Sequence, residues 1–277
     1  MKRFLSILML VAMGVTLVAC GTTKNSSEGK KLSTEDANDS AEAFDWIEGD
    51  IVSLSDAGKK MKKIVVPKEC KELDTQVFSD NENVEEIEFE NPDTKISQMA
   101  FFGCKNLKKI ALPENLKTIL QYTFSECDSL EEIVIPDAVE DIEYEAFAAC
   151  KNLRTVKCGK NVKTIGKYAF YTDEKLENIE FNEGLETIAS SAFQYCHSIK
   201  KIELKEGLKS IERDAFSQMD SLEEIYLPAS LESVADTALF QFQTTKVYVK
   251  KGSWADKNFE SDITGNGTLG ALKKEYY

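Results

Sequence analysis

Residues 101–127 read FFGCKNLKKIALPENLKTILQYTFSEC and hold one full turn of the pattern that decides the fold. The first phenylalanine of this stretch recurs every 23 residues, and Leu239 takes the place after the last of the series Phe78, Phe101, Phe124, Phe147, Phe170, Phe193 and Phe216. Self-similarity at a fixed period of this size is typical of stacked units, none of which can bury its apolar face alone. The sequence therefore predicts a solenoid with one coil for each repeat.

Further apolar columns in each repeat predict how the coil is built. Counted from the phenylalanine, the sixth, ninth and eleventh residues are apolar, as in Leu107, Ile110 and Leu112. The ninth and eleventh residues are two apart, which is the spacing of a strand with one buried face. A small residue precedes the phenylalanine in most repeats, as Ala146 precedes Phe147. We expect one short strand, a turn, a second extended or irregular side, and a tight corner at the phenylalanine.

The eighth and tenth residues of each repeat should point out of this sheet into solvent. The row is mixed in charge, and Tyr226 is the one aromatic residue that we expect on it. The sheet offers roughly 500 Å², less than the about 800 Å² per partner of a standard interface, so a tight protein ligand would also need the flanks. The candidate ligand-binding residues are Lys109, Glu132, Val134, Thr155, Lys157, Asn178, Glu180, Lys201, Glu203, Glu224 and Tyr226.

The seventh residue of each repeat alternates in charge. Residues in one column of neighbouring parallel strands are adjacent, so opposite charges should meet along the whole array. Each exposed pair contributes only about 0 to 1 kcal/mol. We interpret this charge ladder as a device that sets the register of the coils rather than as a ligand site. Its members are Glu85, Lys108, Glu131, Arg154, Glu177, Lys200 and Glu223.

Seven cysteines and one histidine could carry other chemistry. Cys104, Cys127, Cys150 and Cys196 share the column three residues after the phenylalanine, where neighbours in a parallel stack are about 4.8 Å apart. Parallel side chains rarely reach disulfide geometry and the close CxxC spacing of zinc sites is absent, so we interpret these residues as reduced, structural cysteines, with a disulfide or a metal as alternatives. His197 follows Cys196 directly, and adjacent side chains point apart. We expect no catalytic residues, no metal and no cofactor.

Residues 1–19 have the features of an export signal, with a basic start and an apolar run too short to span a bilayer as a helix. The sequence LVAC at residues 17–20 resembles the lipobox of bacterial lipoproteins, and an ordinary secretory signal that contains a cysteine is the alternative. The resemblance implies cleavage before Cys20, a lipid on that residue, and contact with the membrane through the lipid only. Residues 20–43 are polar and should form a disordered tether.

The repeats are expected to span residues 64–250, between an N-terminal cap at 44–63 and a C-terminal cap at 251–277. Terminal coils would otherwise expose half of a core to water, so capping units must be atypical. In the C-terminal cap we expect a short helix from Trp254 to Phe259 with Ser253 as its N-cap, followed by final residues that fray.

Taken together, the columns LxxIxLPxxLxxIxxxAFxxC resemble the leucine-rich repeat, in particular its BspA-like subclass found on bacterial surface proteins. The resemblance covers about residues 64–250. It implies a leucine-rich-repeat solenoid with 23-residue repeats: a right-handed, mainly β superhelix whose parallel sheet lines the concave side. The usual asparagine after the strand stands only as Asn115 and Asn161, so the side that follows the strand should be looser.

The net charge of −14 argues against phosphate backbones and anionic lipid headgroups as partners, so we expect no nucleic-acid partner and a monomeric body. The resemblance and the extended sheet predict a lipid-anchored extracytoplasmic protein that binds an unidentified protein or matrix macromolecule through the sheet and its flanks. A structural envelope module without a specific ligand is the first alternative, and a solute-binding lipoprotein is the second.

Overall fold

The computed structural model describes residues 40–240, 245–259 and 272–277, so the predicted signal at 1–19 and residues 20–39 of the predicted tether lie outside the described residues. Ser40–Ala43 form a short 3-10 helix, η1, and Ala43 is fully buried, so the folded part begins slightly before the predicted cap. Asn38–Tyr277 form one compact unit. Every described core residue lies between Ala43 and Leu272, so this unit carries the whole described core and should fold on its own.

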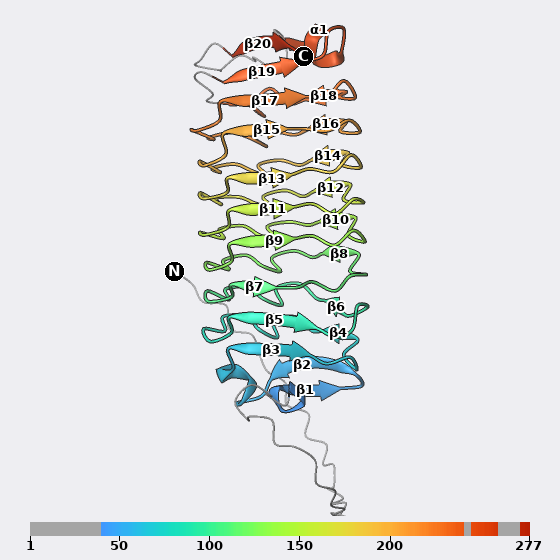
Figure 1. The fold of residues 1–277 in the computed structure, drawn as a ribbon, viewed down its shortest axis with the longest axis vertical. Coiled ribbons are helices and arrows are strands. Elements are labelled where there is room, and N and C mark those ends of the chain that lie inside the picture. Colours follow the sequence, from blue (N-terminus) through green and yellow to red (C-terminus); the bar gives the residue numbers. More distant parts are fainter. Residues whose placement is uncertain (1–39, 241–244, 260–271) are drawn as a thin grey trace, which may run out of the picture. The chain divides into compact units, whose positions relative to one another are not determined.

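Parallel strands on one side of the coils form what we call the strand face (Figure 1). From Lys63 to Leu227 these are the strands that the ninth and eleventh residues predict, and their Cα partners lie one repeat apart, as Thr155 pairs with Asn178. The solenoid and its 23-residue register are therefore confirmed. The strands are β3 (Lys63–Val66), β5 (Glu86–Phe89), β7 (Lys109–Ile110), β9 (Glu132–Val134), β11 (Thr155–Lys157), β13 (Asn178–Glu180), β15 (Lys201–Glu203), β17 (Glu224–Leu227), β19 (Lys246–Val249) and β20 (Lys273–Tyr276).

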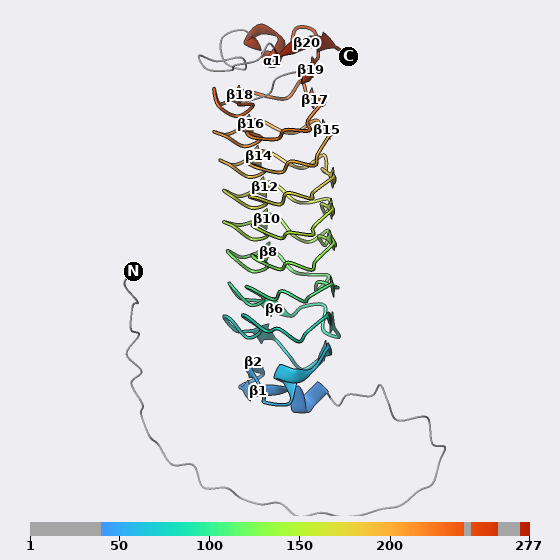
Figure 2. The ribbon, with the colours of Figure 1, turned by 90° about the vertical axis from the view of Figure 1, so that its left-hand side faces the viewer.

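The second side of each coil is extended and forms a rear ladder of short parallel strands (Figure 2). Each two-residue strand buries its second residue, such as Ile142 or Ile165, which explains why that column is aliphatic. At the N-terminal end, β1 (Phe44–Ile47) pairs antiparallel with β2, and a 3-10 turn, η2 (Gly58–Lys60), follows. The rear strands are β2 (Asp50–Leu54), β4 (Glu72–Leu73), β6 (Lys95–Ile96), β8 (Thr118–Ile119), β10 (Asp141–Ile142), β12 (Thr164–Ile165), β14 (Thr187–Ile188), β16 (Ser210–Ile211) and β18 (Ser233–Val234).

The third side, which we call the Phe corner, has a hydrogen-bond ladder of its own although its residues are turns. The Phe124 amide donates to the carbonyl of Ala146 at 2.8 Å, and each phenylalanine of the series makes the equivalent bond to the next coil. Positive φ at Tyr122 (58°) and Glu126 (61°) curves the chain on both sides of Phe124. The phenylalanine rings stack along the core with centroids 5.0 to 5.5 Å apart, close to the spacing of parallel strands.

The C-terminal end carries the predicted helix and one strand that was not predicted. Helix α1 (Trp254–Lys257) is two residues shorter than expected, and the Ser253 hydroxyl accepts a hydrogen bond from the Asp256 amide, which confirms the N-cap. The expected fraying of the final residues is wrong, because β20 pairs in parallel with β19. The strand is held by Asp256, which forms an ion pair with Lys274 at 3.3 Å and accepts a hydrogen bond from the Tyr276 hydroxyl at 2.9 Å.

Candidate functional site

The candidate binding residues all lie in strands of the strand face and are at least partly exposed. Val134 is 55% exposed, which is high for an aliphatic side chain in a sheet. The strand face is not one continuous sheet, however. Its ladder opens between β7 and β9 and again between β13 and β15, which leaves three separate groups of hydrogen-bonded strands.

The charge ladder is well formed at the N-terminal end of the strand face. Glu85 lies between two lysines, with its carboxylate 2.7 Å from the Lys62 ammonium and 2.6 Å from that of Lys108. Hydrogen bonds from Lys108 and Lys62 lower the pKa of Glu85 to about 2. In this block of coils, opposite charges therefore meet as the sequence predicts.

The prediction that the charge ladder is continuous along the whole array is wrong. Arg154 pairs with Glu177 at 2.6 Å, but among the described residues no ion pair joins Lys108 to Glu131 or Glu177 to Lys200. Two of the missing pairs fall where the backbone ladder opens, between β7 and β9 and between β13 and β15. Among the described residues, Glu131 with Arg154 and Lys200 with Glu223 form no ion pair either, although β9 pairs with β11 and β15 with β17. Strand pairing alone therefore does not bring these exposed charges into contact.

One coil explains the first opening. Its strand β7 pairs with β5 of the preceding coil, whereas its strand β8 pairs with β10 of the following coil. The rear ladder accordingly opens one coil earlier than the strand face, between β6 and β8. The segment that connects β7 to β8 thus passes from one block of coils to the next, and the strand face separates beside it.

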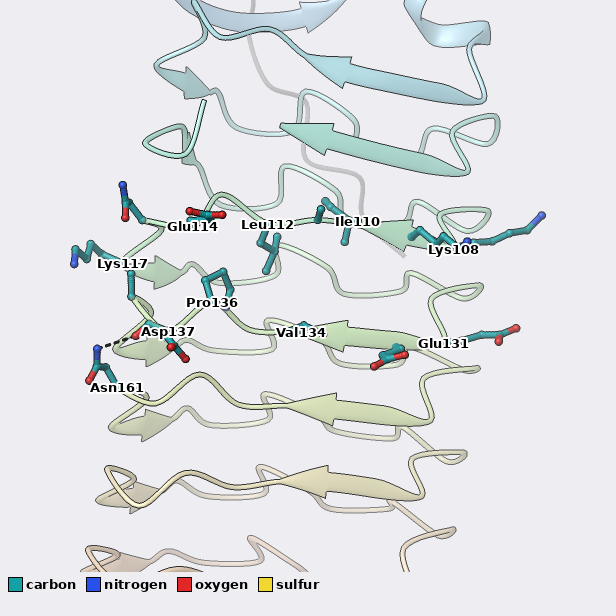
Figure 3. Close-up of a pocket in the computed structure, with 15 residues that line it drawn as sticks. Lys108, Ile110, Leu112, Glu114, Lys117, Glu131, Val134, Pro136, Asp137 and Asn161 are labelled. Carbon is teal, nitrogen blue, oxygen red and sulfur yellow. Dashed lines mark hydrogen bonds between the residues drawn. The ribbon is translucent and has the colours of Figure 1, made fainter. Parts of the chain in front are cut away.

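A cleft of about 1180 Å³ occupies this opening, and we call it the β7–β9 cleft (Figure 3). Ile110 and Leu112 from one coil and Val134 and Pro136 from the next line its middle. Ligand sites generally combine an apolar lining of this kind with a small number of polar groups. Here the polar groups include main-chain atoms, because the backbone hydrogen bonds that join neighbouring strands elsewhere on the strand face are missing between β7 and β9.

The missing backbone bonds are identified by comparison with neighbouring coils. The Lys108 amide donates to the Glu85 carbonyl at 2.9 Å, and the Arg154 amide donates to the Glu131 carbonyl at 2.8 Å. Within the described chain, no equivalent bond runs from the Glu131 amide to the Lys108 carbonyl. The cleft therefore offers main-chain donors on one wall and main-chain acceptors on the other.

Charged side chains stand at both ends of the β7–β9 cleft. Figure 3 shows Lys108 and Glu131 at one end, and Lys117, Asp137 and Asn161 at the other. The side-chain amide of Asn161 donates to the main-chain carbonyl of Asp137 at 2.8 Å, which ties the second end to the following coil. The arrangement suits an extended ligand with an apolar middle and polar or charged ends.

Aromatic rings gather at the C-terminal end of the strand face, where the sequence prediction counted Tyr226 alone. That prediction is wrong: Tyr248 of β19 stacks on Tyr226 with centroids 4.3 Å apart, and Tyr277 meets Tyr226 edge to face at 5.4 Å. The Lys201 ammonium lies 4.8 Å from the Tyr226 ring centroid, and the Lys250 ammonium lies 5.6 Å from that of Tyr277. The alternation KVYVK at residues 246–250 was the available signal, since it gives Tyr248 the same outward face as Tyr226.

The family model described as BspA type leucine rich repeat region matches residues 56–173 and 142–259, with six copies. This chain belongs to that family. The match covers most of the stacked coils and agrees with the parallel ladders described above. No curated protein matches the chain.

Solved structures of other bacterial repeat proteins share the fold of this BspA-type protein. A leucine-rich repeat protein from Bacteroides ovatus is 25% identical with a TM-score of 0.61, over 76% of this chain and 60% of its own length. The T. pallidum leucine-rich repeat protein is 26% identical with a TM-score of 0.56, over 62% of this chain and 81% of its own. The chain thus matches less than two thirds of the Bacteroides ovatus protein. The family and both neighbours are described as repeat proteins, not as enzymes.

The cysteine column of this BspA-type protein serves the core. The four cysteines that follow a phenylalanine by three residues are buried, and each thiol donates to a phenylalanine carbonyl of the preceding coil, as Cys104 does to Phe78 at 3.0 Å. The described cysteines are all free thiols, and the burial of this column agrees with the interpretation as structural residues. Burial raises the pKa of Cys104 to about 12. Such thiols are poor nucleophiles because they stay protonated.

The histidine next to this column points the other way. Cys196 directs its thiol inward to the Phe170 carbonyl, whereas the His197 Nδ1 atom lies 3.1 Å from the Asp220 carboxylate near the surface. In the part of the chain that the structure describes, no group of three His, Cys, Asp or Glu side chains is placed to hold a metal ion. The described helices are also all too short or too polar to cross a bilayer.

Proposed function

We propose that this BspA-type protein is a cell-surface binding protein that holds an extended segment of another protein or macromolecule in the β7–β9 cleft and along the strand face. The observation that carries the proposal is the open ladder of the cleft, with main-chain donors and acceptors beside an apolar middle. Extended peptides bind to such edges through main-chain hydrogen bonds and gain specificity from side-chain pockets.

The cleft also supplies the contact area that the sheet alone lacks. A sheet of this width offers roughly 500 Å², and the flanks reached through the cleft add Glu114, Lys117 and Asp137 to the contact surface. Of the predicted binding residues, Lys109, Glu132 and Val134 line this cleft. They are therefore the ones that we assign to direct ligand contact.

The proposed location is the outer surface of a bacterial membrane, with a lipid anchor on Cys20. Support comes from the export signal and the LVAC sequence before the folded unit. Labelling of growing cells with a lipid analogue should mark the protein, and Cys20→Ser should abolish the label and release the protein from the membrane fraction. A label that persists in Cys20→Ser would contradict the lipid anchor.

Binding can be tested with a photoreactive amino acid placed at Ala111, which is exposed in the cleft. The matched control carries the same group at Lys95, exposed in rear strand β6. Irradiation on intact cells should give a discrete macromolecular adduct from position 111 and none from position 95. If neither position, or both equally, forms adducts, the protein is better described as an envelope module without a specific ligand.

A further inference from the structure

A stripe of half-exposed aromatic side chains crosses the Phe corner, away from the strand face. Neighbouring rings meet edge to face, with centroids 5.1 to 5.9 Å apart. Partly exposed rings that continue from coil to coil form an apolar surface of the kind that marks interaction sites. We call this surface the tyrosine stripe; it consists of Tyr122, Tyr144, Tyr168, Tyr171, Tyr195 and, at its end, His197.

The fold of the corner does not require these tyrosines. The backbone needs a positive φ two residues before each phenylalanine, and Tyr122 (58°) and Tyr168 (59°) provide it. Met99 (59°) and Ser191 (58°) take the same conformation in other coils. Non-glycine residues pay steric strain in this region, and a half-exposed ring recovers little of it by burial. Coil geometry therefore does not explain Tyr122 and Tyr168, and it makes no such demand at Tyr144 or Tyr171.

The stripe already accepts an ammonium group from its own chain. Glu145 directly follows Tyr144, and its carboxylate raises the pKa of the Tyr144 hydroxyl. The Lys167 ammonium lies 4.9 Å from the ring centroid of Tyr168, within the range of a cation–π contact. The whole chain carries a net charge of −14, which attracts cationic partners over longer distances.

We propose that the tyrosine stripe is a second binding surface that takes an extended, lysine- or arginine-rich segment of another protein. Side chains on one face of an extended peptide lie about 6.6 Å apart. This distance is close to the 5.1 to 5.9 Å between successive rings, so alternate cationic residues meet successive tyrosines. Glu145, which directly follows Tyr144 in the chain, supplies a carboxylate partner.

The test measures binding of a labelled peptide of alternating lysine and serine to residues 38–277, which form the compact unit. Replacement of both Tyr144 and Tyr171 by leucine removes two rings and leaves the net charge unchanged. We expect affinity to fall about five- to thirtyfold, as for the loss of two exposed cation–π contacts. Replacement of both by phenylalanine keeps the rings and should keep most of the affinity.

Two further variants separate the stripe from general charge attraction. Tyr276→Leu removes an exposed ring far along the chain and should leave peptide affinity unchanged. Glu145→Gln keeps the rings and should weaken binding severalfold, more at low salt than at high salt. Thermal unfolding of each variant shows whether the unit stays folded, and the phenylalanine and Glu145→Gln variants keep the test valid if the leucine variant does not.

The proposal is overturned if the leucine variant binds the lysine peptide as well as the parent does, or if Tyr276→Leu weakens binding equally. It is also overturned if the stripe binds a neutral oligosaccharide such as cellohexaose through the same rings while the lysine peptide does not bind. Failure of the stripe leaves the cleft proposal untouched, because photocrosslinking at Ala111 probes the strand face.

Discussion

The Phe corner and the strand face belong to the same coils, yet they differ in continuity. At the corner, the amides of the phenylalanine series bond to the next coil without interruption from Phe78 to Phe216. On the strand face, the ladder divides into three groups of strands and opens at the β7–β9 cleft. Directly behind the cleft, the Phe101 and Phe124 rings are 5.1 Å apart, as they are elsewhere in the stack.

The difference shows that one side of a coil can set the stacking distance while another side opens. The Phe corner combines stacked buried rings with unbroken hydrogen bonds, so it fixes the rise of each coil. The strand face does not have to fix the rise of the coils, so it can expose Val134 and unpaired main-chain groups. The buried side of the corner therefore carries much of the stability, and the proposed binding cleft lies where the ladder opens.

The largest expected effect comes from breaking the Phe corner. Phe147 is fully buried and stacks on Phe124 and Phe170 at 5.2 Å on each side. Phe147→Ala should lower the free energy of unfolding by about 3–5 kcal/mol in urea titrations followed by circular dichroism. On the strand face, Val134→Ala should change it by less than about 0.5 kcal/mol. Equal losses in the two variants would refute the proposed division of stability.

A smaller effect is expected from the one carboxylate in the cysteine column. Asp173 is fully buried; its Oδ1 atom accepts a hydrogen bond from the Cys150 amide at 2.8 Å, and its Oδ2 atom has no partner in the described structure. Burial raises the pKa of Asp173 well above its usual range. Asp173→Asn should stabilise the unit at pH 7 by about 1–3 kcal/mol, because the neutral amide avoids the cost of an unpaired buried carboxylate.

The pH dependence of stability checks the sign of this effect. The folded protein holds the Asp173 proton more tightly than the unfolded chain, so this group lowers stability as pH rises above about 4, the unfolded value. Unfolding of the parent and Asp173→Asn should therefore converge near pH 3 and diverge towards pH 8. A constant difference between the two proteins over this range would show that ionisation is not the cause.

Amide hydrogen exchange of the unmodified protein should distinguish the open part of the ladder from the closed part. The Arg154 and Thr155 amides both donate to the Glu131 carbonyl, at 2.8 and 3.3 Å. The Glu131 and Glu132 amides have no equivalent bond to Lys108 within the described residues. Nuclear magnetic resonance should show faster exchange at positions 131 and 132 than at 154 and 155. Equal protection would mean that the ladder is closed in solution.

The smallest effect is expected for the exposed charge ladder. Because Lys108 and Lys62 lower the pKa of Glu85 to about 2, its carboxylate should titrate at about that pH in carbon-detected magnetic resonance. Replacing both lysines by alanine should return the titration towards about 4.3, with little change in thermal stability. Titration of the parent carboxylate at the ordinary value would show that these ion pairs do not persist in solution.

The repeat could be predicted from the sequence because its columns are buried one coil after another. Leu107 and Ile110 recur at the same places in the later coils, since a coil that loses them cannot cover its neighbour. The strand face and the Phe corner follow from these columns. The tyrosine stripe does not, because Tyr122, Tyr144 and Tyr195 stand at different offsets from the phenylalanine and form no column.

The aromatic cluster at the end of the strand face was missed for a related reason. Tyr248 follows a repeat of altered length, so counting from Leu239 does not place it beside Tyr226. The parallel register of β17 and β19 does, and β20 then brings Tyr277 against the same ring. Counting residues from the phenylalanine column fails wherever one repeat is longer or shorter than the others while its strand still pairs with the neighbouring strand.

By itself, the sequence determined the coil, its 23-residue period, its buried columns and the positions exposed on the strand face. Tertiary structure alone decided where the ladder opens, since β11 pairs with both of its neighbours whereas β7 pairs with β5 and not with β9. The physical reason is the size of the competing terms. The burial of a column recurs in each coil and sums over the stack, whereas the pairing of one strand edge depends on a few hydrogen bonds of about 1 kcal/mol each.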